Sequence, residues 1–100
     1  EASALPTLDR EGLGVYHAAG CIPGGTRRNF NSYGQDLILE EATDFARDLV
    51  CDPQTSGGLL VSAAQNVEAE VRAVLTQEGL HAEPIGTVVS GEAGRLRVRG

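Results

Sequence analysis

The stretch LEEATDFARDLVCDPQTSGGLLVSA, residues 39–63, carries the local signals that decide the fold class. Apolar residues recur at helical spacing between Leu39 and Val50, with charged residues on the opposite face, which predicts an amphipathic helix. Pro53 predicts an end to that helix, because proline disfavours helical geometry in the residue before it. The apolar run from Leu59 to Ala63 has the length of a short strand. A helix, a turn and a strand are therefore expected in this order.

The residues before this stretch predict one weak helix and one long loop. Arg10 to Gly20 is compatible with a helix, although Gly12 and Gly14 each cost roughly 1 kcal/mol relative to alanine. Cys21 to Gly34 is rich in glycine, asparagine, serine and proline, so it is predicted to be a structured loop. Loops of this length inside a compact domain are usually functional or disordered.

The residues after it predict a second helix and two further strands. Asn66 to Glu78 repeats valine and leucine at helical spacing, with Asn66 placed as the N-cap and Gly79 as a left-handed C-cap. Ile85 to Val89 and Arg95 to Arg99 are predicted to be strands joined by a glycine-containing turn. In the second of these strands arginine alternates with leucine and valine, which indicates a sheet with one solvent-exposed face.

The intermixed helices and strands place the chain in the α+β class, as a layered α/β sandwich forming a single domain over residues 1–100. A length of 100 residues, with 41% hydrophobic and 22% charged residues, fits one folded domain with one core. The helices at 39–50 and 66–78 are expected to pack on a sheet that includes 59–63 and 85–89, with Phe45 in the core.

The composition excludes several classes of partner and site. A formal net charge of -6 argues against a nucleic-acid or anionic-membrane surface, since both need clustered positive charge. All eight basic residues are arginine, so a P-loop lysine and a Schiff-base lysine are excluded within this segment. No apolar run has the length of a membrane span and no targeting pattern is seen, so a cytoplasmic protein is predicted. Cys21 and Cys51 are expected to be reduced, buried thiols.

Two segments combine a glycine pair with hydroxyl residues, namely Pro23 to Phe30 and Cys51 to Leu60. Consecutive glycines allow backbone N–H groups to converge on an anion, so each segment is a candidate phosphate site. The alternative is that each pair only forms a tight turn or a close backbone crossing. Arg27 and Arg28 either add donors for a phosphate or carboxylate or belong to the solvated surface. Neither segment has the spacing of a Walker A loop or a dinucleotide fingerprint.

These two segments, in this order and separation, resemble the selenophosphate synthetases, the selenide, water dikinase family. The resemblance extends over essentially the whole chain, and its most specific part is the Asp-Pro-Gln-Thr-Ser-Gly-Gly-Leu-Leu string at 52–60. Other ATP-using families of the aminoimidazole ribonucleotide synthetase-like superfamily are not known to carry that string in this form. The remaining matching stretches are Ala4-Leu5-Pro6, residues 24–30, Ser32-Tyr33-Gly34 and Ile85-Gly86.

The resemblance implies the C-terminal domain of an enzyme that converts selenide, ATP and water into selenophosphate, AMP and phosphate for selenocysteine synthesis. It also implies ATP and Mg²⁺ in the full-length enzyme, held mainly by a missing N-terminal domain, and a homodimer of two-domain subunits. The family's nucleophile and metal carboxylates belong to that missing part. The fragment alone is therefore expected to be inactive, to bind no cofactor, and to use none of the following as catalytic or metal-binding groups: Asp9, Asp36, Asp44, Asp48, Asp52, Cys21, Cys51, His17 and His81.

The resemblance and the glycine pairs together indicate which residues face nucleotide. Those expected to position the phosphates are Thr26, Asn29, Thr55, Ser56, Gly57 and Gly58. The two glycine segments are predicted to lie close together, on an edge that faces the missing domain or a dimer partner. Two alternatives stay open, which are a sister ATP-dependent enzyme of the same fold and a non-enzymatic binding or dimerisation module.

Overall fold

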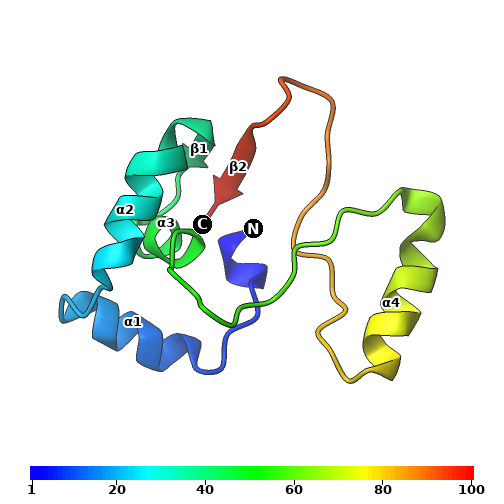
Figure 1. The fold of residues 1–100 in the computed structure, drawn as a ribbon, viewed down its shortest axis with the longest axis horizontal. Coiled ribbons are helices and arrows are strands. Elements are labelled where there is room, and N and C mark those ends of the chain that lie inside the picture. Colours follow the sequence, from blue (N-terminus) through cyan, green and yellow to red (C-terminus); the bar gives the residue numbers. More distant parts are fainter.

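The computed structural model describes residues 1–100 and contains four α-helices and a two-stranded sheet (Figure 1). None of these helices combines the length and the apolar character that crossing a bilayer requires. In chain order the α-helices and strands are α1 (Arg10–Ala18), α2 (Gly24–Tyr33), β1 (Leu37–Glu40), α3 (Asp44–Val50), α4 (Glu68–Gln77) and β2 (Leu96–Arg99). Three 3-10 turns accompany them, at Ala2–Ala4, Gly34–Asp36 and Gln65–Val67. The predicted α+β class is confirmed, because helices and a small parallel sheet share one chain.

The sheet pairs β1 with β2 in parallel, in a register that runs from Leu37 opposite Leu96 to Glu40 opposite Arg99. The prediction of a strand at the C-terminal end is confirmed, with β2 beginning one residue later than expected. The predicted strands at 59–63 and 85–89 are wrong, because both segments lack regular secondary structure and pair with no neighbouring strand. Residues that favour strands do not form one by themselves, because the backbone hydrogen bonds of a strand need a neighbouring strand.

The predicted helix at 39–50 is correct only in its second half. Leu39 and Glu40 belong to β1, and Glu41 then adopts a left-handed backbone with φ of 53°, which separates strand from helix. The helix begins at Asp44 because Thr43 is its N-cap, whose side-chain oxygen accepts a hydrogen bond from the Ala46 amide at 3.1 Å. It ends at Val50, before Pro53 as expected.

The predicted loop at 21–34 is wrong, because most of it forms α2. Pro23 is the N-cap, a position where its missing N–H costs nothing, and the helix runs to Tyr33 despite its glycine and asparagine content. One face of α2 lies against α3, and this tertiary contact outweighs the weak local propensity. The residues on that face are Thr26, Asn29, Phe30 and Tyr33, which have helical spacing.

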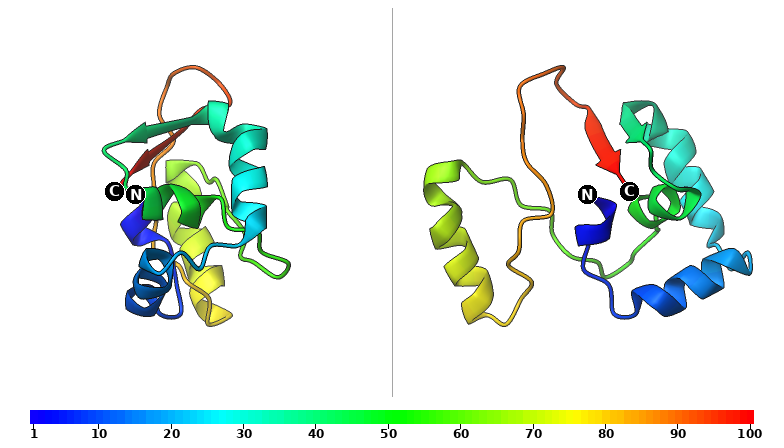
Figure 2. Two further views of the ribbon diagram at one scale, coloured as in Figure 1. Left: turned by 90° about the vertical axis from the view of Figure 1, so that its left-hand side faces the viewer. Right: turned by 180° about the vertical axis from the view of Figure 1, so that it is seen from behind.

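The second predicted helix forms as α4, and Gly79 has the expected left-handed backbone with φ of 69°. Asn66 does not cap it, because a 3-10 turn at Gln65–Val67 precedes the helix. The expectation that this helix packs on the sheet is wrong, since α4 stands apart from it in Figures 1 and 2.

The core lies where the 3-10 turn at the N-terminal end, α3 and β2 meet. Its buried residues are Ala2, Ala46 and Val98, and Ala42 and Val50 pack against them. Phe45 was expected in the core but is half-buried, with its ring edge on His17 at 5.3 Å between centroids. The core is therefore small and built from small side chains.

Candidate functional site

The two glycine segments touch at the start of α2. A Cβ atom built on Gly25 would lie 2.6 Å from Cγ of Pro53, a distance that real Cβ atoms do not show. Gly25 is therefore required for the close approach of α2 to the chain that leaves α3. Nothing lies within 4 Å of a Cβ atom built on Gly24, so Gly24 is not required for this contact.

Asn29 makes the second link between these segments. Its side-chain nitrogen Nδ2 donates a hydrogen bond to the carbonyl oxygen of Cys51 at 2.9 Å. Cys51 follows the last residue of α3, where carbonyl groups lack partners within the helix. Asn29 thus fixes the point from which the second glycine segment begins.

Thr26 lies between these contacts and is only 2% exposed. Its hydroxyl oxygen Oγ1 is buried without a hydrogen-bond partner, while its amide donates to the carbonyl of Pro23 at 3.0 Å. An unsatisfied buried hydroxyl costs about 1 to 3 kcal/mol. Thr26 therefore fills space between α2 and α3 instead of facing solvent.

The other four candidate residues are exposed. Thr55, Ser56, Gly57 and Gly58 follow Gln54 in the loop after α3. Gln54 donates through Nε2 to Oδ2 of Asp52 at 3.2 Å, and its Oε1 lies 2.7 Å from a Cβ position built on Gly57. Nothing lies within 4 Å of that position on Gly58. The structure thus joins Thr26 and Asn29 to the base of this loop and leaves its tip open to solvent.

The two cysteines have different surroundings, although both are free. Cys51 is fully buried, as predicted, and burial raises the pKa of its thiol more than a hydrogen bond with Tyr33 lowers it. Burial, together with the Cys51 contact, also raises the pKa of Tyr33. Cys21 is exposed, so its predicted burial is wrong. A buried thiol with a raised pKa stays protonated at neutral pH and is a poor nucleophile.

His17 has a partner that lies far from it in the sequence. Its Nε2 lies 2.9 Å from Oδ2 of Asp48, and the other Asp48 oxygen lies 2.8 Å from Nη2 of Arg47. Burial by itself would raise the pKa of Asp48, but the hydrogen bonds from His17 and Arg47 outweigh it and hold that pKa below its usual value. Sequence reasoning treated His17 as isolated because its partner is on another helix. The pair ties α1 to α3.

The carboxylates, histidines and cysteines do not form a metal centre within this chain. No three or more of these side chains lie together in an arrangement that could hold an ion.

Most of the chain, including α2 and α3, matches a known sequence family. The family described as AIR synthase related protein, C-terminal domain, matches residues 10–99. The chain belongs to this family.

The chain is also similar to proteins named selenide, water dikinase. It is 45% identical to the protein of Yersinia pseudotuberculosis over 96 residues, which are 96% of this chain and 26% of that protein. It is 52% identical to the protein of Aeromonas salmonicida over 84 residues, 83% of this chain and 23% of that protein. For Escherichia coli K12 the identity is 43% over 95 residues, 95% of this chain and 26% of that protein.

These matches confirm the resemblance drawn from the two glycine segments. The chain spans about a quarter of the length of the relatives that it matches. A comparison with solved structures found no match.

Proposed function

We propose that this chain is the C-terminal part of a selenide, water dikinase, which converts selenide, ATP and water into selenophosphate, AMP and phosphate. The observation that carries the proposal is the 45% identity to a protein of that name over 96% of this chain. The match covers 96% of the chain and therefore includes both glycine segments, where the residue pattern is most specific. ATP and Mg²⁺ are assigned to the full-length enzyme. The carboxylates that bind the metal are assigned to the part of that enzyme outside this chain.

In this proposal the loop after α3 approaches the nucleotide phosphates. Thr55, Ser56, Gly57 and Gly58 are exposed, and glycine pairs present backbone N–H groups to an anion without obstruction by side chains. Thr26 and Asn29 act as positioning residues. They hold α2 against α3, and the Asn29 bond to Cys51 sets where the loop begins.

The remaining part of the parent protein is proposed to supply the nucleophile, the metal ligands and the other wall of the cleft. It is also proposed to form the homodimer. The parent is assigned to the cytoplasm. Without that part the fragment lacks the proposed nucleophile and metal ligands, so it is proposed to be inactive by itself.

The reaction is tested with the full-length protein by measuring AMP formation from ATP with and without selenide. Selenide-dependent AMP and selenophosphate are the expected products. ATP cleavage that does not depend on selenide would instead favour a sister enzyme of the same fold. The isolated chain serves as the negative control, and AMP formation by it alone would contradict the assignment of the catalytic groups elsewhere.

The loop assignment is tested by Thr55→Val in the full-length enzyme. Loss of one hydroxyl contact that strengthens in the transition state should lower kcat/KM about tenfold, which corresponds to about 1.4 kcal/mol. The melting temperature should not change, since Thr55 is exposed. Thr76→Val, an exposed threonine on α4, is the matched control and should keep full activity. If Thr55→Val keeps full activity, the proposed phosphate contact is contradicted and the loop serves only as a turn.

A further inference from the structure

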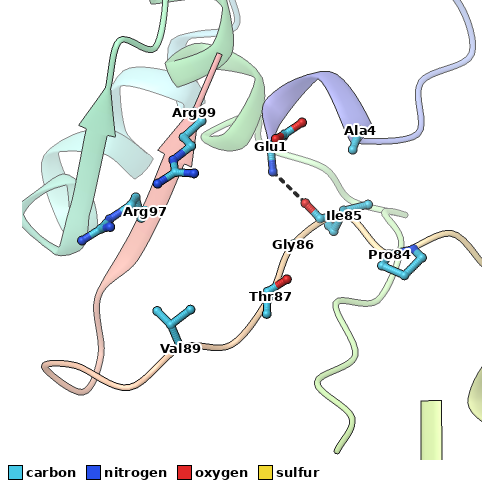
Figure 3. A pocket seen from close by; sticks show the side chains of 9 residues that line it. All are labelled: Glu1, Ala4, Pro84, Ile85, Gly86, Thr87, Val89, Arg97 and Arg99. Atoms are coloured by element: carbon cyan, nitrogen blue, oxygen red, sulfur yellow. Dashed lines mark hydrogen bonds between the residues drawn. The ribbon is translucent and has the colours of Figure 1, made fainter. Parts of the chain in front are cut away.

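Most arginines of the chain are held by acceptors within the protein, either carboxylates or backbone carbonyls. They are Arg10, Arg47, Arg72, Arg95, Arg97 and Arg99. Arg97 and Arg99, for example, lie on β2 in Figure 3 and share the carboxylate of Glu40. Arg27 and Arg28 make no ion pair and no side-chain hydrogen bond, and both are exposed on α2. These two guanidinium groups are therefore the ones available to a ligand.

The turn of α2 places Arg27 and Arg28 differently. A helix advances by about 100° per residue, so Arg28 lies about 60° around the axis from Gly25 and Arg27 about 160° from it. Gly25 is the point of contact with the segment that leaves α3, since a Cβ atom built on it would lie 2.6 Å from Cγ of Pro53. Arg28 thus borders this contact, whereas Arg27 faces away from it.

The N-terminal end of α2 offers further donors beside Arg28. Side chains on a helix lean toward its N-terminus, so the side chain of Arg28 extends over the turn that contains Gly24 and Gly25. Nothing lies within 4 Å of a Cβ position on Gly24. The N-cap residue Pro23 makes no side-chain hydrogen bond, so the first amides of the helix have no capping partner. The guanidinium group and this positive end of the helix both favour an anion.

The exposed loop at 55–58 begins close to the same place. It starts two residues after Pro53, and two residues span at most about 7 Å. Asp52 is the only charged residue between α3 and the end of this loop, and its Oδ2 accepts a hydrogen bond from Gln54 at 3.2 Å. The loop therefore supplies hydroxyl and backbone N–H donors but no cation. A nucleotide polyphosphate carries several negative charges, which a nearby guanidinium group would neutralise in part.

We propose that Arg28 binds a phosphate group of the nucleotide that the loop at 55–58 contacts, and that Arg27 belongs to the solvated surface. This inference rests on the proposed function and adds to it a cation that the glycine segments otherwise lack. The planar fork of a guanidinium group holds two phosphate oxygens through parallel hydrogen bonds. A phosphate is favoured over a single carboxylate because the hydroxyl and N–H donors beside Arg28 can hold further oxygens of the same ligand.

The test is calorimetric titration of the full-length protein with a nonhydrolysable ATP analogue and Mg²⁺. Arg28→Gln should weaken binding of the analogue about tenfold or more, because it removes a charge-assisted bidentate contact. Arg27→Gln removes the same charge from the neighbouring position and is the matched control. It should change the affinity less than about twofold, since solvent and salt screen an exposed charge that faces away from the ligand. Arg28→Lys should recover part of the loss, because it keeps the charge but not the fork.

Adenosine, titrated into the same proteins, separates a phosphate contact from a loosened helix. Its affinity should be equal in Arg28→Gln and in the unsubstituted protein, because adenosine has no phosphate. Equal weakening of both ligands would show a structural role for Arg28 and overturn the proposal. Equal effects of the Arg27 and Arg28 substitutions, or an unchanged affinity of Arg28→Gln for the analogue, would overturn it as well. In the last case a carboxylate of the parent protein becomes the better partner for Arg28.

The proposed function is judged separately, by AMP formation in the unsubstituted protein with and without selenide. If AMP forms without selenide, the dikinase assignment fails, but the comparison of Arg27 with Arg28 still decides the present proposal because analogue binding does not involve selenide. If AMP forms only with selenide and both glutamine variants bind the analogue equally well, the dikinase assignment stands and the role given to Arg28 is wrong.

Discussion

The Asp48 carboxylate is mostly buried and has two charged or polar partners, one on α1 and one on α3. It is 12% exposed and lies within 2.9 Å of both His17 and Arg47. Its pKa is lowered in the folded state, so its stabilising effect is present above the ordinary carboxyl pKa, which is about 3.9. That effect is lost as the pH falls through the lower folded pKa. His17 and Asp48 thus make the junction of α1 and α3 sensitive to acid.

Replacement of Asp48 by asparagine tests this account. Asp48→Asn should lower the free energy of unfolding at pH 7 by about 2 kcal/mol, since it weakens two charge-assisted hydrogen bonds in a mostly buried position. The deficit relative to the unsubstituted chain should shrink below pH 4. Urea unfolding at pH 7 and pH 3 measures both effects. Asp44→Asn is the control, because Asp44 also contacts Arg47 but is 82% exposed, and it should change stability by less than about 0.5 kcal/mol.

The sequence could single out Thr26 and Asn29 as unusual but could not assign their surroundings. Both belong to the segment that carries the first glycine pair, which is a candidate phosphate-binding pattern. Their burial and the bond from Asn29 to Cys51 depend on how α2 lies against α3, and no local pattern encodes that contact. His17 shows the same limit, because its partner Asp48 is on a different helix.

The docking of α2 against the end of α3 depends on a glycine without a side chain. Gly25→Ala should cost about 1 to 3 kcal/mol of unfolding free energy, because the new Cβ would overlap the ring of Pro53 and the helix would have to move. Gly24→Ala has open space at the same helix end and is the matched control. That control should be neutral or stabilise the helix by up to about 1 kcal/mol. Denaturant unfolding measures the free energy of both variants. Equal changes in Gly25→Ala and Gly24→Ala would show that the Pro53 contact is unimportant.

Helices marked by local sequence patterns could be predicted, whereas elements that depend on tertiary contacts could not. Gly79 ends α4 in the expected conformation, and the charged face of 44–50 marked a helix. By contrast, α2 has poor intrinsic propensity and forms because its Thr26 to Tyr33 face is covered by α3. The segments 59–63 and 85–89 have strand-like composition but no strand partner. Pairing of β1 with β2 joins residues distant in the sequence, so neither periodicity nor turn signals could fix its register.

Two segments outside the core expose large apolar side chains and have no strand partner. The core holds the 3-10 turn at Ala2–Ala4, α3 and β2 together, whereas the segments 59–63 and 85–89 expose large apolar residues. Leu59 is 93% exposed and Val88 is 78% exposed. Both segments also have unpaired backbone groups, which are the feature of a sheet edge that accepts another strand. Because the chain spans about a quarter of its relatives, the rest of the parent protein is the expected cover for these segments.

Hydrogen–deuterium exchange measures that cover directly. In the isolated chain the amides of 59–63 and 85–89 should exchange close to the rate of an unstructured peptide, because no backbone bond protects them. In the full-length protein they should exchange at least about 100-fold more slowly, which corresponds to about 2.7 kcal/mol of local protection. The internal reference is the interior of α2, whose amides are bonded within the helix in both forms and should change far less. Equal exchange of 59–63 and 85–89 in both forms would mean that these segments stay open in the parent protein, and their apolar side chains would then need another explanation.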